Sequence, residues 1–513
     1  MPFNSVQFLV FFPSVCACYA LLTAKARSAR PAQCLLLAAS LYFYACWKAA
    51  YLVLILASVA ITWLSGLGME RFPARKKLVL VGSLVLNLAI LFFFKYYNWL
   101  AGTVSLPLLN VALPVGISFY TFQAVGYSID VYRGTLKAER DFITYALFVT
   151  FFPQLVAGPI ERAENLLPQF KATCSFDYKR ITDGLKLMAW GLFLKIVIAD
   201  RMAVYVNSVY RSVDDSYGTA LLLATVCFAV QVYADFAGYS DIAIGAAQVL
   251  GFKLMKNFDH PYFSTSIPEF WRRWHISLGS WFRDYIYYPV GFSSWNKKLC
   301  SPFCGKSRRK LSKMTGMVAL SCVWLATGLW HGAAWHFVAW GVLHGAYILA
   351  SISTEKIRSS LRGKLGLEKD GQVIRPWRCV QVLMTFAMVN AGYVFFRARG
   401  MGQAVRIFRS FLAVPGELAV AEQALYTTGS PAEFLKILMM DRKVTGVGLD
   451  FMIVNLFLCL VLFLSSFIAR HRDGRVIVDG LPLVARWTLY LALMFGILIF
   501  RSLLETEFLY FQF

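Results

Sequence analysis

Long apolar runs recur along the whole chain, and they limit the fold more than any other feature. The run LVLVGSLVLNLAILFFF at residues 78–94, for example, contains no charged side chain. About 20 such residues in a helix cross the ~30 Å hydrocarbon core of a bilayer. Because lipid offers the backbone no hydrogen-bond partners, a spanning run satisfies its own peptide groups as a helix. We therefore expect an all-α, polytopic integral membrane protein.

Composition excludes the other broad classes. Hydrophobic residues make up 58% of the chain and charged residues 15%, whereas a soluble domain has about 45–50% apolar and about 25% charged residues. A soluble core formed by 513 residues cannot hide so many apolar runs. Secreted, disordered, fibrous and nucleic-acid-binding proteins are therefore excluded.

The segmentation of the chain predicts about 11–14 membrane helices, including short and re-entrant segments. Residues 103–118 and 153–160 are too short or too rich in Gly and Pro for a simple crossing. Such backbone is tolerated at membrane depth only where protein or a cavity covers it. We expect one domain over residues 1–513, with its core motifs at 113–352. The expected spans lie near 6–22, 33–48, 49–67, 78–97, 111–130, 141–158, 183–199, 218–234, 238–252, 314–330, 333–352, 379–397, 449–469 and 483–503.

The net charge of +23 has its explanation in the loops. Residues 297–313 carry seven basic residues and no acid, and residues 353–378 carry seven basic and three acidic residues. By the positive-inside rule both loops face the cytoplasm. The 39 residues between them, 314–352, fit two crossings with a turn at 328–335. This topology puts His331 far from the cytoplasmic face, at or beyond the membrane middle.

Ionisable side chains at membrane depth are candidates for function. His331 stands out because Gly328 and Gly332 flank it, although a neighbouring helix carbonyl could equally satisfy its ring. His336 and His344 are expected on the same helix but on other sides of it, packed against aromatic residues. No metal site is predicted.

Two further stretches combine charge with apolar residues. Residues 268–291 hold six ionisable residues among tryptophans. This stretch forms either an in-plane interfacial helix or the lining of a polar cavity. Residues 231–245 hold Asp235 and Asp241 in an apolar stretch that we expect to break at Gly238. A transporter also uses broken helices with carboxylates near the membrane middle.

Several long motifs occur in fixed order and resemble the membrane-bound O-acyltransferase family. The similarity is greatest to its bacterial branch, which resembles the membrane subunit of alginate O-acetyltransferase. The closing FLYFQF is also similar to that branch. The motifs are LPVGISFYTFQAVGYSIDVYRG, FFPQLVAGPIER, GLFLKIVIADR, QVYADFAGYSDIAIG, FWRRWHISLGSWFRDYIYYPVG and GLWHGAAWHFVAWGVLHG.

The resemblance implies roles for individual residues. His331 matches the family's near-invariant histidine and is expected to act as the base for the incoming hydroxyl. His275 holds the second motif position, where many members carry Asn or Asp, and is expected to position a reactant or stabilise the oxyanion. Arg272 or Arg273 either attracts the phosphates of acetyl-CoA or pairs with Glu269 or Asp284. The remaining residues expected to support the site are Asp200, Asp235, Asp241, Trp274 and Trp330.

The resemblance also implies the biological setting. It implies an acetyltransferase in the bacterial inner membrane, with acetyl-CoA as donor substrate and no bound cofactor. The expected partners are a polysaccharide and an extracytoplasmic acetyltransferase protein. The alternatives are a D-alanyl transferase acting on teichoic acid, a transporter or lipid flippase, and a scaffold without chemistry.

Overall fold

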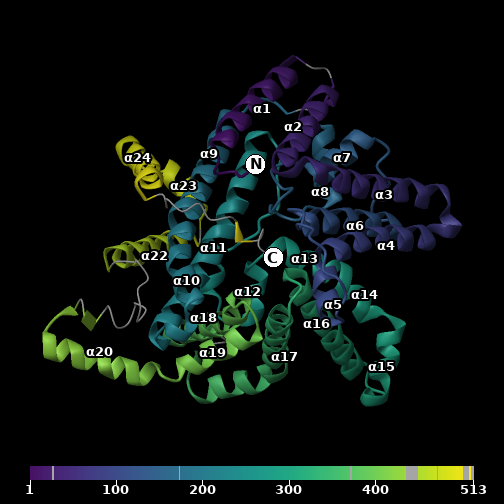
Figure 1. Cartoon of the computed structure of the whole chain (residues 1–513). Coiled ribbons are helices and arrows are strands. Elements are labelled where there is room, and N and C mark those ends of the chain that lie inside the picture. The colour runs from purple at the N-terminus through teal and green to yellow at the C-terminus, as the bar shows by residue number, and fades with distance from the viewer. Residues whose placement is uncertain are drawn as a thin grey trace.

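The computed structural model describes residues 1–25, 28–172, 174–369, 372–431, 433–434, 449–470, 472–500 and 508–509. The described chain is almost entirely helical (Figure 1). Its only strands form a two-residue antiparallel hairpin, β1 (Glu368–Lys369) and β2 (Gln372–Val373). The α-helices are α1 (Val6–Lys25), α2 (Arg30–Lys48), α3 (Leu52–Arg71), α4 (Lys76–Lys95), α5 (Tyr97–Thr103), α6 (Ile117–Arg133), α7 (Phe142–Thr150), α8 (Ala163–Lys171), α9 (Tyr178–Leu192), α10 (Asp200–Arg211), α11 (Gly218–Val249), α12 (Ile267–Arg273), α13 (Ile276–Phe282), α14 (Tyr288–Phe292), α15 (Ser294–Cys304), α16 (Arg308–His331), α17 (Trp335–Lys364), α18 (Arg375–Arg397), α19 (Met401–Phe411), α20 (Val414–Thr428), α22 (Leu449–Ala469), α23 (Gly474–Asp479) and α24 (Leu483–Phe500).

Short helices of other types join some of these elements. Two of them are π-helical, and each continues an α-helix without a break. The short elements are η1 (Ala49–Tyr51), η2 (Pro73–Arg75), η3 (Phe193–Ala199), η4 (Val213–Asp215), η5 (Pro261–Phe263) and η6 (Arg283–Tyr287).

The predicted class, an all-α polytopic membrane protein, is confirmed. Among the described residues, nine helical runs are long and apolar enough to cross a membrane, and one of them, Arg30–Arg71, contains both α2 and α3. Shorter or less apolar helices such as α6 and α9 complete the bundle. Buried apolar side chains from Met1 to Leu509 belong to one continuous cluster. That cluster supports the single-domain division, which stays a prediction.

The central helix α11 corrects one expectation. The chain is helical from Gly218 to Val249 and does not break at Gly238. A Cβ atom at Gly238 would lie 2.7 Å from the carbonyl oxygen of Gly191 in α9, and one at Gly191 would lie 2.5 Å from that of Gly238. Gly184 and Gly245 make the same close contact, seven residues away from the first pair on each helix. The glycines therefore let two backbones touch, as small residues do between membrane helices.

The expected span at 141–158 is wrong, because α7 contains nine residues and ends at Thr150. Residues 151–161 follow as irregular backbone that is buried throughout. Neighbouring side chains bond this backbone: the hydroxyl of Ser40 accepts from the amide of Phe152 at 3.0 Å, and that of Ser277 accepts from the amide of Ile160 at 3.0 Å. Non-helical chain survives at membrane depth only with such partners.

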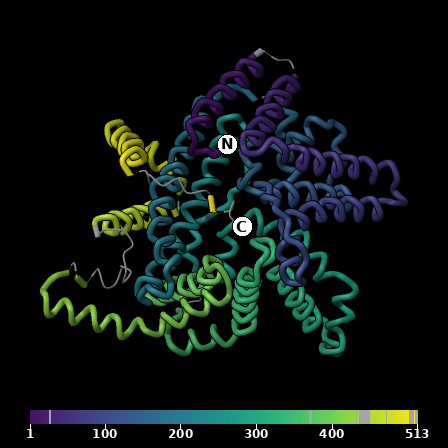
Figure 2. Tube along the Cα trace, in the orientation of Figure 1, coloured from purple at the N-terminus to yellow at the C-terminus, as the bar shows by residue number. Residues whose placement is uncertain are grey.

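The first residues of the chain pack against α11. The ring of Phe3 stacks on that of Tyr239 with 4.6 Å between centroids. Figure 2 shows the N-terminal purple helices at one end of the central teal helices.

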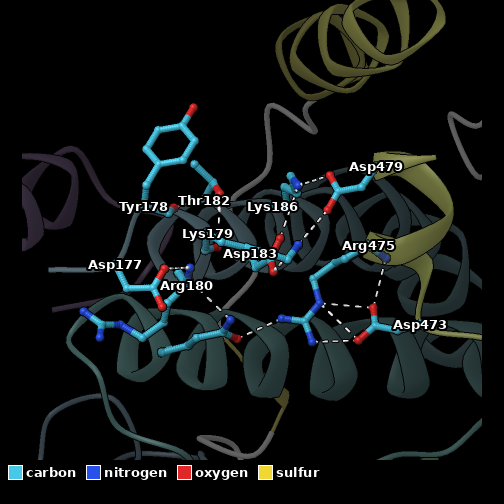
Figure 3. Close-up of polar contacts among 11 residues, drawn as sticks. Asp177, Tyr178, Lys179, Arg180, Thr182, Asp183, Lys186, Asp473, Arg475 and Asp479 are labelled. Atoms are coloured by element: carbon cyan, nitrogen blue, oxygen red, sulfur yellow. Dashed lines mark hydrogen bonds and ion pairs between the residues drawn. The ribbon is translucent and has the colours of Figure 1, made fainter. Parts of the chain in front are cut away.

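A cluster of charges joins α23 to the start of α9 and the end of α11 (Figure 3). Lys179 and Lys186 of α9 both pair with Asp479, and Arg475 donates to the side chain of Gln248 at 2.8 Å. The hydrogen bonds from Lys186 and Lys179 hold the pKa of the Asp479 carboxyl below its ordinary value. The described part of the C-terminal helices is thus tied to the bundle by ion pairs as well as by apolar contacts.

Candidate active site

Two long helices begin at basic loops and end beside each other. α4 starts next to Arg71, Arg75 and Lys77, and α16 starts in the basic loop 297–313. At the other end, the ammonium of Lys95 donates to the carbonyl of Trp330 at 2.5 Å. The 24 residues of α16 span about 36 Å, enough to cross the hydrocarbon core. By the positive-inside rule this junction faces away from the cytoplasm.

His331 is the last residue of α16 and is buried. Its ring lies 4.8 Å from the rings of both Trp330 and Trp340, and 5.1 Å from that of Phe396 in α18. The extended residue Gly332 follows, and a Cβ there would collide with the ring of Phe337. The glycine therefore allows α17 to fold back tightly against His331.

The expectation that His336 and His344 share a helix with His331 is wrong, because both lie on α17. Their predicted packing against aromatic residues is confirmed. The ring of His336 lies 4.3 Å from that of Phe337. The ring of His344 lies 5.0 Å from that of Trp340. Each ring also has a hydrogen bond, His336 with the carbonyl of Ala398 and His344 with the indole N–H of Trp271.

His275 connects α12 to α13 in a left-handed backbone conformation, with φ at 46°. Non-glycine residues adopt this region rarely, and such residues concentrate at functional sites. The buried Asn257 holds the junction: its side-chain oxygen lies 3.2 Å from Nδ1 of His275 and accepts from the hydroxyl of Ser277 at 2.8 Å. The ring of Phe236 in α11 packs against His275 at 4.6 Å.

The structure brings the two expected catalytic histidines to one place. The ring of Trp330 lies 5.8 Å from that of His275 and 4.8 Å from that of His331, so one indole contacts both. Phe119 at the start of α6 packs against Trp330 at 5.6 Å. His331 is also within electrostatic range of His275 and Lys95.

A small, partly enclosed pocket reaches His331. It lies at the junction of α4 with α16, between the end of the loop 104–116 and the irregular segment 151–161. Its lining consists of Lys95, Leu113, Pro114, Val115, Gly116, Ile117, Ser118, Phe119, Val156, Trp330 and His331.

Asp200 and Asp235 meet at a residue that the sequence reasoning did not single out. Nζ of Lys195 lies 2.8 Å from a carboxylate oxygen of Asp200 and 2.7 Å from one of Asp235, and all three side chains are buried. The other oxygen of Asp235 accepts from the amide of Leu509 at 2.9 Å. An ionisable residue inside an apolar run was the available signal for Lys195. Of the closing FLYFQF, only Phe508 and Leu509 are described.

The other expected site residues contact groups other than His331. Asp241 has Lys256 and Arg475 as its oppositely charged neighbours. Arg273 pairs with Glu269 at 2.9 Å, which is one of the two expected alternatives, and Arg272 is exposed. Asp284 pairs instead with Arg162 at 3.0 Å and with Arg283. Trp274 stacks on Phe270 with 5.5 Å between centroids, in an aromatic cluster.

Two buried histidines contact one indole, and one of them, His331, lines a pocket. Such a site in a helical membrane protein is suited to proton transfer and carbonyl chemistry. The sequence comparisons agree with this class. The model of the membrane-bound O-acyltransferase family matches residues 75–391, and the chain belongs to this family. It is therefore an acyltransferase and a multi-pass membrane protein.

Individual relatives narrow the branch. A probable alginate O-acetylase of Azotobacter vinelandii is 34% identical, over 80% of this chain and 78% of its own length. Another, from Pseudomonas putida, is 32% identical over 100% of both chains. A peptidoglycan O-acetyltransferase of Helicobacter pylori is 29% identical, over 100% of this chain and 97% of its own length.

Proposed function

We propose that this acyltransferase moves acetyl groups from a cytoplasmic thioester, acetyl-CoA, across the bacterial inner membrane for O-acetylation of an extracellular, alginate-like polysaccharide. The observation that carries the proposal is the position of His331. It lies at the far end of α16 from the basic loop 297–313, beside a pocket on that far side. Relatives that match this chain along most of its length carry the names of polymer O-acetylating enzymes.

In the proposed reaction His331 acts as the base. Its imidazole takes the proton of the attacking hydroxyl while the hydroxyl oxygen bonds to the thioester carbonyl carbon. The C–S bond then breaks, and the leaving thiolate takes the proton from the imidazolium. His275 contacts the same indole as His331, that of Trp330. Because the side-chain oxygen of Asn257 accepts from Nδ1 of His275, the neutral ring presents Nε2 as an acceptor, and we assign His275 to positioning a reactant.

The donor and the acceptor arrive from opposite sides in this proposal. Arg272 is exposed on α12 and forms no salt bridge with another described residue, so it is better placed than the paired Arg273 to attract the phosphates of acetyl-CoA. The acetyl group leaves on the extracytoplasmic side, to a polysaccharide or to a partner acetyltransferase protein.

The test replaces His331 by Ala in a polymer-producing host that lacks its own copy of the gene. We expect O-acetyl on the secreted polymer to fall at least about a hundredfold, the usual contribution of a general base. Polymer yield should stay unchanged. The matched control is His336→Ala, because His336 is also buried but hydrogen-bonds to a backbone carbonyl outside the pocket.

Both variants are compared at equal amounts of protein in the membrane. Unchanged acetylation in His331→Ala would refute the catalytic role and favour a scaffold. Loss of the polymer itself would favour a transporter. Transfer of D-alanine instead of acetyl by the wild type would place the chain with the teichoic acid enzymes.

A further inference from the structure

The side chain of Lys95 lies in the pocket beside His331. Among the described residues that line this pocket, Lys95 is the only lysine, and the lining contains no arginine and no acidic residue. The others are apolar, apart from the hydroxyl of Ser118 and the two rings of Trp330 and His331. The pocket therefore presents a single basic group, the amine of Lys95, within a lining that is otherwise uncharged or aromatic.

Two of the three hydrogen-bond donors of the Lys95 ammonium have partners. An ammonium has three donors. One donates to the carbonyl of Trp330 at 2.5 Å and one to the hydroxyl of Ser118 at 3.3 Å. Within the described chain, no carboxylate lies within ion-pair distance of Lys95. Lys195, by contrast, is held by two carboxylates.

Lys95 also lies over the ring of Trp330, with Nζ 5.7 Å from the ring centroid, but no negatively charged group among the described residues neutralises it. Removing a charge from water costs several kcal/mol unless a partner compensates it. A carboxylate would supply that partner through a charge-assisted hydrogen bond, which is about twice as strong as a neutral one. The position of Lys95 next to His331 means that this partner would sit beside the hydroxyl undergoing acetylation.

We propose that Lys95 is the recognition residue for a carboxylate on the acceptor, so that the pocket selects a sugar acid over a neutral sugar. This inference rests on the proposed acetyl transfer. The ammonium group binds the carboxylate of a hexuronate ring, and the same ring presents its hydroxyl to His331. Lys95 would then set the specificity for an acidic polymer, and it hydrogen-bonds to Trp330, the residue directly before the catalytic base His331.

The competing explanation is that Lys95 only holds α16. A cation is favourable at a helix C-terminus, and Tyr96 provides a second contact by donating to the carbonyl of Leu329 at 2.9 Å. A pure clamp would affect all acceptors equally. Recognition of a carboxylate would affect only acidic acceptors, and this difference makes the two explanations separable.

The experiment uses the purified full-length protein and two acceptors, an oligohexuronate and the same oligosaccharide after reduction of its carboxyl groups. Binding is measured by calorimetry, and acetyl transfer from acetyl-CoA is measured separately. The variants are Lys95→Gln, which keeps a donor without the charge, and Lys95→Arg, which keeps the charge. Tyr96→Phe is the control, because it removes the second clamp and leaves the pocket lining intact.

We expect wild type, Lys95→Arg and Tyr96→Phe to bind the acidic acceptor at least about tenfold more tightly than the reduced one. In Lys95→Gln that ratio should fall to near one, with binding of the reduced acceptor unchanged. Equal binding of both acceptors by wild type, or an unchanged ratio in Lys95→Gln, would overturn the inference. An equal loss of transfer to both acceptors with the ratio retained would leave Lys95 a clamp and also overturn it.

The transfer assay keeps the two proposals apart. If wild type discriminates between the acceptors but acetylates neither, carboxylate recognition stands and the proposed acetyl transfer fails. If wild type acetylates both acceptors and binds them equally, the acetyl transfer stands and the recognition fails.

Discussion

Lys195 illustrates how single charged residues are tolerated inside this bundle. Its ammonium is buried between Asp200 of α10 and Asp235 of α11, in the π-helical segment that joins α9 to α10. π-Helical turns often mark functional sites. Here the π-helical turn carries Lys195, which pairs with carboxylates on two different helices. Asp235 precedes Phe236, whose ring packs against His275.

Replacing Lys195 by Met should destabilise the protein by about 3–5 kcal/mol, because two buried carboxylates lose their cation. The change is measured as the free energy of unfolding in mixed detergent micelles. Lys179→Met is the matched control, since its ion pairs with Asp183 and Asp479 are at the surface, where an ion pair adds little to stability. Equal stability of the two variants would contradict the buried-charge account.

At the same scale, the sequence predicts some residues well and others poorly. His331 could be found because the positive-inside rule and the length of 314–352 fix its depth. Lys95 could not, since a lysine at the end of an apolar run also fits a side chain reaching for the headgroups. Its contact with Trp330 joins residues 235 positions apart. The left-handed conformation of His275 depends on Asn257, which no local pattern links to it.

At the scale of elements, the contact between α9 and α11 depends on glycine. Gly191 and Gly238 approach each other closely, and Gly184 and Gly245 do so nearer the start of α9 and the end of α11. The sequence shows the glycines but cannot distinguish a helix break from a close helix contact, because that difference lies in the partner helix. The expected break at Gly238 failed for this reason.

Gly191→Ala should therefore lower the free energy of unfolding by about 1–3 kcal/mol, since its methyl group would overlap the carbonyl of Gly238. The matched control is Gly82→Ala in α4, where nothing lies within 4 Å of the added Cβ atom. That control should be neutral or stabilise by about 0.5–1 kcal/mol, as Ala favours helix over Gly. Both values come from unfolding of the purified variants. A neutral Gly191→Ala would show that the two helices separate easily.

At the scale of the whole molecule, the basic loops fix an orientation that labelling can check. In a parent chain whose exposed cysteines Cys18, Cys34, Cys46 and Cys379 are replaced by Ser, Lys310→Cys should react with an impermeant maleimide only from the cytoplasmic face. Leu106→Cys, in the exposed loop before α6, should react only from the opposite face. The parent chain gives the background. Labelling of both variants from one face would contradict the position assigned to His331.

The class of the molecule, an all-α polytopic membrane protein, could be predicted from the sequence, because apolar runs of spanning length and basic loops follow directly from the requirements of a bilayer. The path of the chain through residues 151–161 could not be. There the backbone is irregular and depends on hydroxyls from distant helices, such as Ser40 and Ser277, for its hydrogen bonds.

The junction of α4 with α16 also has a consequence for biosynthesis. Lys95 leaves the ribosome 235 residues before Trp330, which at ordinary elongation rates is about 12–47 s. During that interval the nascent α4 ends in a cation whose carbonyl partner has not been made. Phe396 completes the ring contacts of His331 later still. A nascent chain that stalls before α18 would therefore enter the membrane with its histidine in place and its aromatic enclosure missing.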